Sequence, residues 1–133
     1  MSRASLLLGL WALVGAAVGC TSPAQGFCNA SADCNATFAD FIPIPDAAGD
    51  ADDSAAVCAA LQQGQINAYR ANTEPSCQEV ANTMEAYFAC IGAAFAKDPD
   101  GCDVIEDECT DERDDWQDAV DDVDGDECSS NED

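Results

Sequence analysis

The sequence predicts an all-α fold: a small, disulfide-cross-linked bundle of about four helices, with an acidic C-terminal tail. Three observations support this prediction. Apolar residues recur at steps of three and four, the spacing of one helix face. Proline and glycine clusters separate the periodic segments. The 133-residue chain has nine cysteines and begins with an apparent export signal, a combination that indicates disulfides formed in an oxidising compartment.

The first helix is expected from Phe27 to Phe41. Proline at 43 and 45 ends it, because proline lacks a backbone donor and disfavours helical geometry in the residue before it. An acidic linker follows at residues 46–53. The expected apolar face of this helix comprises Phe27, Ser31, Cys34, Phe38 and Phe41.

The second helix is expected to start at Asp53 or Ser54, either of which is a good N-cap. Gly64 lies within it as a weak point, because glycine lowers helix propensity. The expected buried face comprises Val57, Cys58, Leu61, Ala68 and Tyr69.

The third helix has the most regular pattern, and Ser76 and Glu79 have the spacing of a capping box. Its face comprises Val80, Met84, Tyr87, Phe88, Ile91 and Phe95, and the turn at 98–101 ends it. A fourth helix is expected from Asp103 to about Val123, with Gly125 as its terminator. The face of that helix comprises Ile105, Cys109, Trp116, Ala119, Val120 and Val123. We expect the aromatic side chains of Tyr87, Phe88, Phe95 and Trp116 to form the core; the alternative is that they line a ligand pocket.

The first residues have the features of a secretory signal. Arg3 precedes an apolar run at residues 6–19, which is shorter than the roughly 20 residues that span a bilayer. A basic start, a short apolar core and small residues before the break are typical of such signals.

The run ends in Ala17-Val18-Gly19-Cys20, which resembles the lipobox of bacterial lipoproteins. The resemblance implies cleavage before Cys20, a diacylglycerol on its thiol and acylation of the new amino terminus, with chains such as palmitate. Lipoboxes most often have leucine where this chain has Ala17. The sequence Ala-x-Gly also suits ordinary signal peptidase, which would release a secreted or periplasmic protein. An uncleaved anchor is the third alternative.

Thr21 differs from the aspartate that retains enteric lipoproteins in the inner membrane, so the resemblance implies the outer membrane. The layout also resembles small cysteine-rich helical lipoproteins of Gram-negative bacteria, which implies no particular activity. The predicted organisation is a signal peptide at 1–19, an anchor cysteine and spacer at 20–26, a cysteine-rich helical domain at 27–123 and an acidic tail at 124–133.

If Cys20 carries a lipid, eight cysteines remain to form disulfides. Positions six or seven apart on one helix are about 9–10 Å apart along its axis, and a disulfide needs Cα atoms within about 7 Å. Cys28 therefore should not pair with Cys34, nor Cys102 with Cys109. Eight cysteines allow 105 connectivities. Distance from the turns suggests Cys90–Cys109, which is best supported, and Cys34–Cys58. Cys77–Cys128 and Cys28–Cys102 are the pairs that then remain.

Charge limits the possible partners. Without residues 1–19 the chain has 27 acidic residues against Arg70, Lys97 and Arg113, a net charge of −24. Eighteen of the acidic residues lie at 98–133. Such charge repels nucleic acids and anionic headgroups. The expected partners are a membrane, through the lipid, and divalent cations or a basic protein.

Metal sites have little support in the sequence. Zinc sites use closely spaced cysteines or histidines, and the chain has no histidine. The pairs Asp98/Asp100 and Asp122/Asp124 each echo part of a calcium loop. Neither copy has the terminal glutamate that such a loop uses, so a solvated acidic surface is the favoured interpretation.

We expect no catalytic residues and no cofactor, since the chain has no G-x-S-x-G motif and no glycine-rich phosphate loop. The sequence therefore suggests a non-enzymatic envelope lipoprotein with an acidic helical domain. The alternative is a ligand- or protein-binding module with an apolar groove between its helices.

Overall fold

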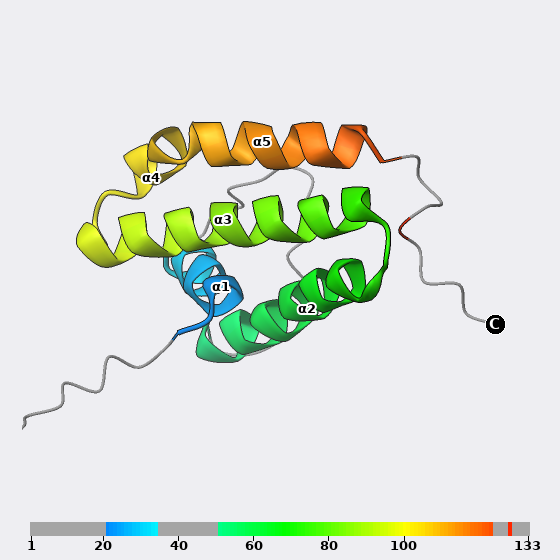
Figure 1. The fold of residues 1–133 in the computed structure, drawn as a ribbon. Coiled ribbons are helices and arrows are strands. Elements are labelled where there is room, and N and C mark those ends of the chain that lie inside the picture. Colours follow the sequence, from blue (N-terminus) through cyan, green and yellow to red (C-terminus); the bar gives the residue numbers. More distant parts are fainter. Residues whose placement is uncertain (1–20, 35–50, 124–127, 129–133) are drawn as a thin grey trace, which may run out of the picture.

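A computed structural model describes residues 21–34, 51–123 and 128 (Figure 1). Five helices form this part: α1 (Pro23–Asp33), α2 (Ala51–Ala71), α3 (Pro75–Lys97), α4 (Cys102–Glu108) and α5 (Thr110–Asp121). The predicted all-α, disulfide-cross-linked bundle is confirmed. None of the described helices is long and apolar enough to cross a membrane.

Helix α3 is the centre of the bundle. It contacts each of the other four helices. Figure 1 shows α1 and α2 on one side of α3, and α4 and α5 on the other. The regular apolar face predicted for this helix is confirmed: Val80, Met84, Tyr87, Phe88 and Ile91 are buried. Phe95 is half-buried near the end of the helix.

The start of α3 differs from the prediction. Its N-cap is Glu74, which makes no side-chain cap hydrogen bond, and proline occupies the first helical position. The backbone N–H of Glu74 donates to Asn72 Oδ1 over 2.9 Å. The Gln78 side chain donates to the Asn72 carbonyl over 3.0 Å. The predicted capping box at Ser76 and Glu79 is therefore wrong, because Asn72 organises this turn and the helix begins before Ser76.

Helix α1 begins four residues before its predicted start at Phe27. Ser22 is the N-cap, its Oγ accepting the backbone N–H of Gln25 over 3.2 Å. Pro23 follows at the first helical position, where a missing N–H costs nothing. Most of the predicted spacer at 21–26 is therefore helical. Phe38 and Phe41, assigned to the same helix, lie outside the described residues.

Helix α2 buries only part of the predicted face: Cys58 is buried and Tyr69 packs against the core, but Ala68 is exposed. Val57 and Leu61 are 46% and 53% exposed. The buried stripe comprises Ala55, Cys58, Ala59, Gln62 and Ile66. The disulfide from Cys58 to Cys28 turns this stripe toward α1. Alanine is small, so its burial lets two helices pack closely, whereas the larger valine and leucine remain on the surface.

The single helix predicted from Asp103 to Val123 is wrong, because the segment breaks at Cys109. That residue separates α4 from α5 with φ −113° and ψ 23°. The Thr110 hydroxyl donates to the Asp107 carbonyl over 3.1 Å, and such back-bonding competes with helical pairing. Cys109 is buried and bonded to Cys90 of α3. The helix therefore breaks at the residue whose disulfide holds α4 and α5 against α3. Gly125 lies outside the described residues.

All eight described cysteines form disulfides, with Cα–Cα distances of 5.5–5.9 Å. The predicted pairs Cys90–Cys109 and Cys77–Cys128 are confirmed. The other two predicted pairs, Cys34–Cys58 and Cys28–Cys102, are wrong, and the observed pairs are Cys28–Cys58 and Cys34–Cys102. Cys34 at the end of α1 reaches the start of α4, which leaves Cys28, earlier on the same helix, to face α2.

Four aromatic rings join three helices in the core. Phe27 of α1 stacks on Phe88 of α3, with ring centroids 4.3 Å apart. Trp116 of α5 meets Phe88 edge-on at 5.6 Å and Tyr87 at 5.7 Å. Each such pair contributes about 0.5–1.5 kcal/mol beyond its buried area.

The backbones of α1 and α3 come into direct contact at two glycines. A Cβ atom on Gly92 would lie 3.1 Å from the Gly26 Cα and 3.3 Å from its carbonyl carbon. The obstructing atoms are main-chain atoms of a helix tied to α2 by the Cys28–Cys58 disulfide. Any larger side chain at Gly26 or Gly92 must therefore push α1 and α3 apart.

Two Gly→Ala variants test this contact. A Cβ atom added to Gly64 would meet no other atom within 4 Å, so Gly64→Ala should raise the free energy of unfolding by about 0.5–1 kcal/mol through helix propensity alone. Gly92→Ala should lower it, because overpacking costs about 1–3 kcal/mol and exceeds that gain. Urea unfolding of both variants measures the difference. Equal stabilisation by the two substitutions would contradict the close approach.

Candidate binding groove between α1 and α3

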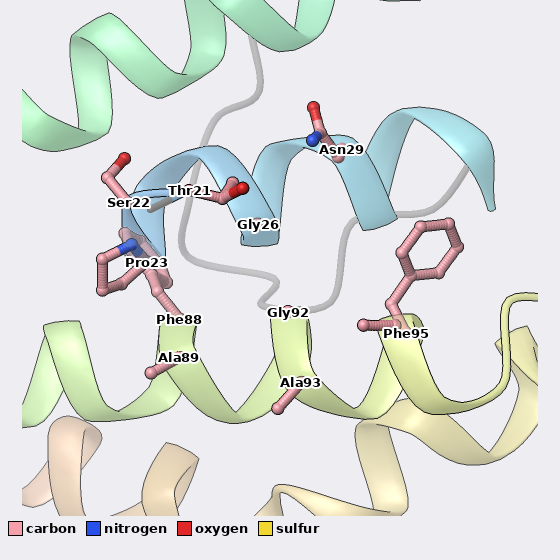
Figure 2. A pocket seen from close by; sticks show the side chains of 11 residues that line it. Thr21, Ser22, Pro23, Gly26, Asn29, Phe88, Ala89, Gly92, Ala93 and Phe95 are labelled. Atoms are coloured by element: carbon pink, nitrogen blue, oxygen red, sulfur yellow. The ribbon is translucent and has the colours of Figure 1, made fainter. Parts of the chain in front are cut away.

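A groove of about 400 Å³ runs between α1 and α3, within the range of about 300–1,000 Å³ typical of ligand pockets. Figure 2 shows Thr21, Ser22 and Pro23 at one end and Phe95 at the other. The described residues that line the groove are Thr21, Ser22, Pro23, Gly26, Asn29, Phe88, Ala89, Gly92, Ala93, Phe95 and Ala96.

The groove exists because its walls carry small side chains. Gly26 and Gly92 bring the two backbones together. On α3, Ala89, Ala93 and Ala96 line the groove and are too short to fill the space beside that contact. The large side chains of Tyr87 and Ile91 on α3 lie in the core instead, where both are fully buried, and Phe88 and Phe95 are the large α3 residues that reach the groove. One face of α3 therefore packs the bundle, and another leaves an apolar hollow.

Polar groups at the groove are few and already engaged within α1. The side-chain amide of Gln25 donates to Asn29 Oδ1 over 2.7 Å, and the Ser22 hydroxyl accepts the helix-capping hydrogen bond. None of the described lining residues is charged. Apolar walls with a few polar groups suit an apolar ligand that carries a polar group.

The acidic surface lies on the other side of α3, on α4 and α5. These two helices carry ten acidic residues and one base, Arg113. Arg113 pairs with Glu106 over 3.2 Å and with Asp114 over 3.1 Å. Its hydrogen bond to Asp114 is the main cause of the raised pKa of Arg113. Both pairs are partly exposed and contribute little to stability. One arginine cannot neutralise ten carboxylates, so most of the negative charge on α4 and α5 remains.

The calcium candidates are not brought together as one site. Asp98 and Asp100 are exposed in the turn before α4, and Asp122 is exposed at the end of α5. The intervening helices put about 30 Å between the two ends, at 1.5 Å per residue. Asp124 lies outside the described residues.

Among the described residues, Cys90, Cys109 and Glu112 place possible metal-ligating atoms within 4.8 Å of one another. The two sulfur atoms are bonded to each other. A disulfide has no thiolate to offer, and thiolate is the form that ligates metals. The group is therefore a structural cross-link beside a carboxylate, and it does not make a metal site.

Tyr87 is the buried titratable group of the α3–α5 interface. Burial raises the pKa of its phenol well above the usual value, and the negative charge of Glu106 raises that pKa further, while Arg113 lowers it. The side chain packs against Phe27, Phe88 and Trp116. Tyr87 therefore stays protonated as part of the core.

Comparison with protein-family models, curated proteins and solved structures found no match to this chain.

The groove residues were not singled out by the sequence reasoning, except for Phe88 and Phe95, which were assigned to the core. One signal could have found them. Small residues recur on α3 at positions 89, 92, 93 and 96, at steps of three, one and three. A helix face without large side chains indicates either close packing or a hollow.

The raised pKa of Tyr87 predicts a stability change in alkali. The unfolded tyrosine loses its proton near its ordinary pKa of 10.0, whereas the folded one retains it. The folded state then binds more protons, so the free energy of unfolding should fall as the pH rises above about 10, by up to about 1.4 kcal/mol per pH unit. Chemical unfolding between pH 8 and 11 measures this slope.

Tyr87→Phe should flatten that slope. Tyr69→Phe is the matched control, because it replaces the other of the two tyrosines and leaves Tyr87 in place. A slope that disappears with Tyr69→Phe, or persists in Tyr87→Phe, would contradict the assignment.

Proposed function

We propose that this protein is a non-enzymatic lipoprotein of the bacterial cell envelope, anchored in a membrane by a lipid on Cys20. One observation carries the proposal. The eight cysteines in the described part of the chain all pair with one another, and Cys20 is the ninth. Disulfides of this density are typical of exported proteins, and the pairing leaves the lipobox cysteine available for lipidation.

The start of α1 supports a short attachment. The helix begins at Pro23 and is capped by Ser22, so only Thr21 and Ser22 separate the anchor cysteine from the folded domain. Two residues span at most about 7 Å. A lipid on Cys20 would therefore hold the domain directly at the membrane surface.

The position of the charge supports the same arrangement. Helix α5 lies across α3 from α1 in Figure 1, so a domain anchored through α1 would present the acidic helices away from the bilayer. That orientation avoids repulsion between carboxylates and anionic headgroups. It also exposes the acidic face to divalent cations or to a basic protein, and we propose these as its partners. Such binding should weaken as salt concentration rises.

The signal resembles a lipobox, and Thr21 follows its cysteine, Cys20. This combination favours the outer membrane as the destination. Release into the periplasm or medium is the alternative if ordinary signal peptidase cleaves the chain.

The groove favours a second candidate function. Its volume and uncharged lining suit an apolar ligand or an apolar peptide side chain, as in a small binding module. That function is compatible with a lipid anchor. It places the binding site between α1 and α3, whereas the first proposal places the binding surface on α4 and α5.

Cys20→Ala tests the proposed anchor. The variant should move from the membrane fraction to the soluble fraction, because it has no thiol to receive the lipid. Thr21→Ala is the matched control: it changes the neighbouring residue, keeps the thiol and should stay in the membrane fraction. Immunoblots of the two fractions give the distribution.

Mass spectrometry of the intact membrane-extracted protein completes this test. It reports the cleavage point, the lipid and the number of disulfides together. An unchanged distribution of Cys20→Ala, or a wild-type mass without lipid, would rule out the proposed anchor.

A further inference from the structure

We infer that the groove between α1 and α3 holds one acyl chain of the lipid on Cys20. This inference rests on the proposed lipidation, and it assigns the groove an occupant from within the same molecule. It predicts a protein that folds part of its own anchor against its surface.

The first argument is position. Thr21, bonded directly to Cys20, lines the end of the groove together with Ser22 and Pro23. Ser22 and Pro23 are held in place by the helix: Ser22 caps α1 by accepting a hydrogen bond from the Gln25 N–H, and Pro23 is the first helical residue. A lipid on Cys20 is thus tethered beside the groove, and tethering makes its binding intramolecular, with a high effective concentration.

The second argument is chemistry. The described lining has glycine, alanine and phenylalanine along its length, the hydroxyl groups of Thr21 and Ser22 at one end, and the amide of Asn29 farther along α1. The hydroxyl groups beside Cys20 and the mostly apolar walls beyond them match a lipid whose polar ester region lies at Thr21 and whose methylene chain extends toward Phe95 (Figure 2). A polar or anionic ligand would find no charged lining residue to bind.

The third argument is size. The α3 wall runs from Phe88 to Ala96, which is about 12 Å at 1.5 Å per residue. This length is shorter than an extended palmitate chain, so with a volume of about 400 Å³ the groove accommodates part of one chain and excludes a bundle of several. The remaining chains of a lipidated Cys20 stay in the bilayer, and two chains suffice for stable anchoring where one is marginal.

Photo-cross-linking of the full-length lipidated protein tests the inference. Phe95 is replaced by p-benzoylphenylalanine, the protein is irradiated in its native membrane, and its peptides are analysed by mass spectrometry. We expect residue 95 to be joined to the acyl chain on the Cys20 peptide. The same photoreactive group at Ala60, which is exposed on α2, should give no such product.

A pair of alanine substitutions provides the matched control. Ala93→Leu, which narrows the groove, should abolish most of the residue-95 cross-link. Ala86→Leu should leave it intact, because Ala86 is exposed on the same helix outside the lining and its side chain leans toward the N-terminus of α3, away from the groove. Circular dichroism of both variants verifies that the bundle remains folded.

The outcomes separate this inference from the proposed anchor. A protein without lipid on Cys20 overturns both. A lipidated protein whose residue 95 cross-links only to membrane phospholipid, or to nothing, keeps the anchor and overturns the inference. Equal cross-linking in the Ala93→Leu and Ala86→Leu variants also overturns it.

Discussion

The fold depends on four disulfides that oppose the charge of the chain. A net charge of −23 on 133 residues repels itself and destabilises any compact state. Helices α4, α1 and α5 are also short, with seven, eleven and twelve residues, and isolated helices below about 12–15 residues are marginal in water. Each cross-link typically contributes about 2–4 kcal/mol. Two bridges fix α1 to α2 and to the start of α4, and two fix α3 to Cys109 and Cys128.

Close packing of α1 on α3 has a consequence for the surface. The glycine pair lets the backbones meet, and the stacked rings of Phe27 and Phe88 fill the space on the core side. On the outer side the neighbouring alanines leave the groove open. One contact thus produces both the tight helix pair and the apolar hollow that begins at Thr21. The same geometry places the acidic helices on the far side of α3 (Figure 1).

Helix faces with large apolar side chains could be predicted from the sequence, whereas faces with small side chains could not. The α3 face was predictable because Met84, Tyr87, Phe88 and Ile91 repeat with the helical period. The α2 face was not, because alanines form much of its buried stripe while leucine and valine lie outside. The break at Cys109 depends on a tertiary cross-link. The disulfide pairing depends on which helices are neighbours, which the sequence pattern does not specify. The groove depends on glycine and alanine, whose small side chains leave no apolar period to detect.

Thermal unfolding of the oxidised and reduced protein, followed by circular dichroism at low and high NaCl, tests the dependence on disulfides most directly. Dithiothreitol should abolish most of the helical signal in low salt, and high salt should restore part of it by screening the carboxylates. The oxidised protein should remain folded in both. A reduced protein that melts at the same temperature as the oxidised one would contradict this account.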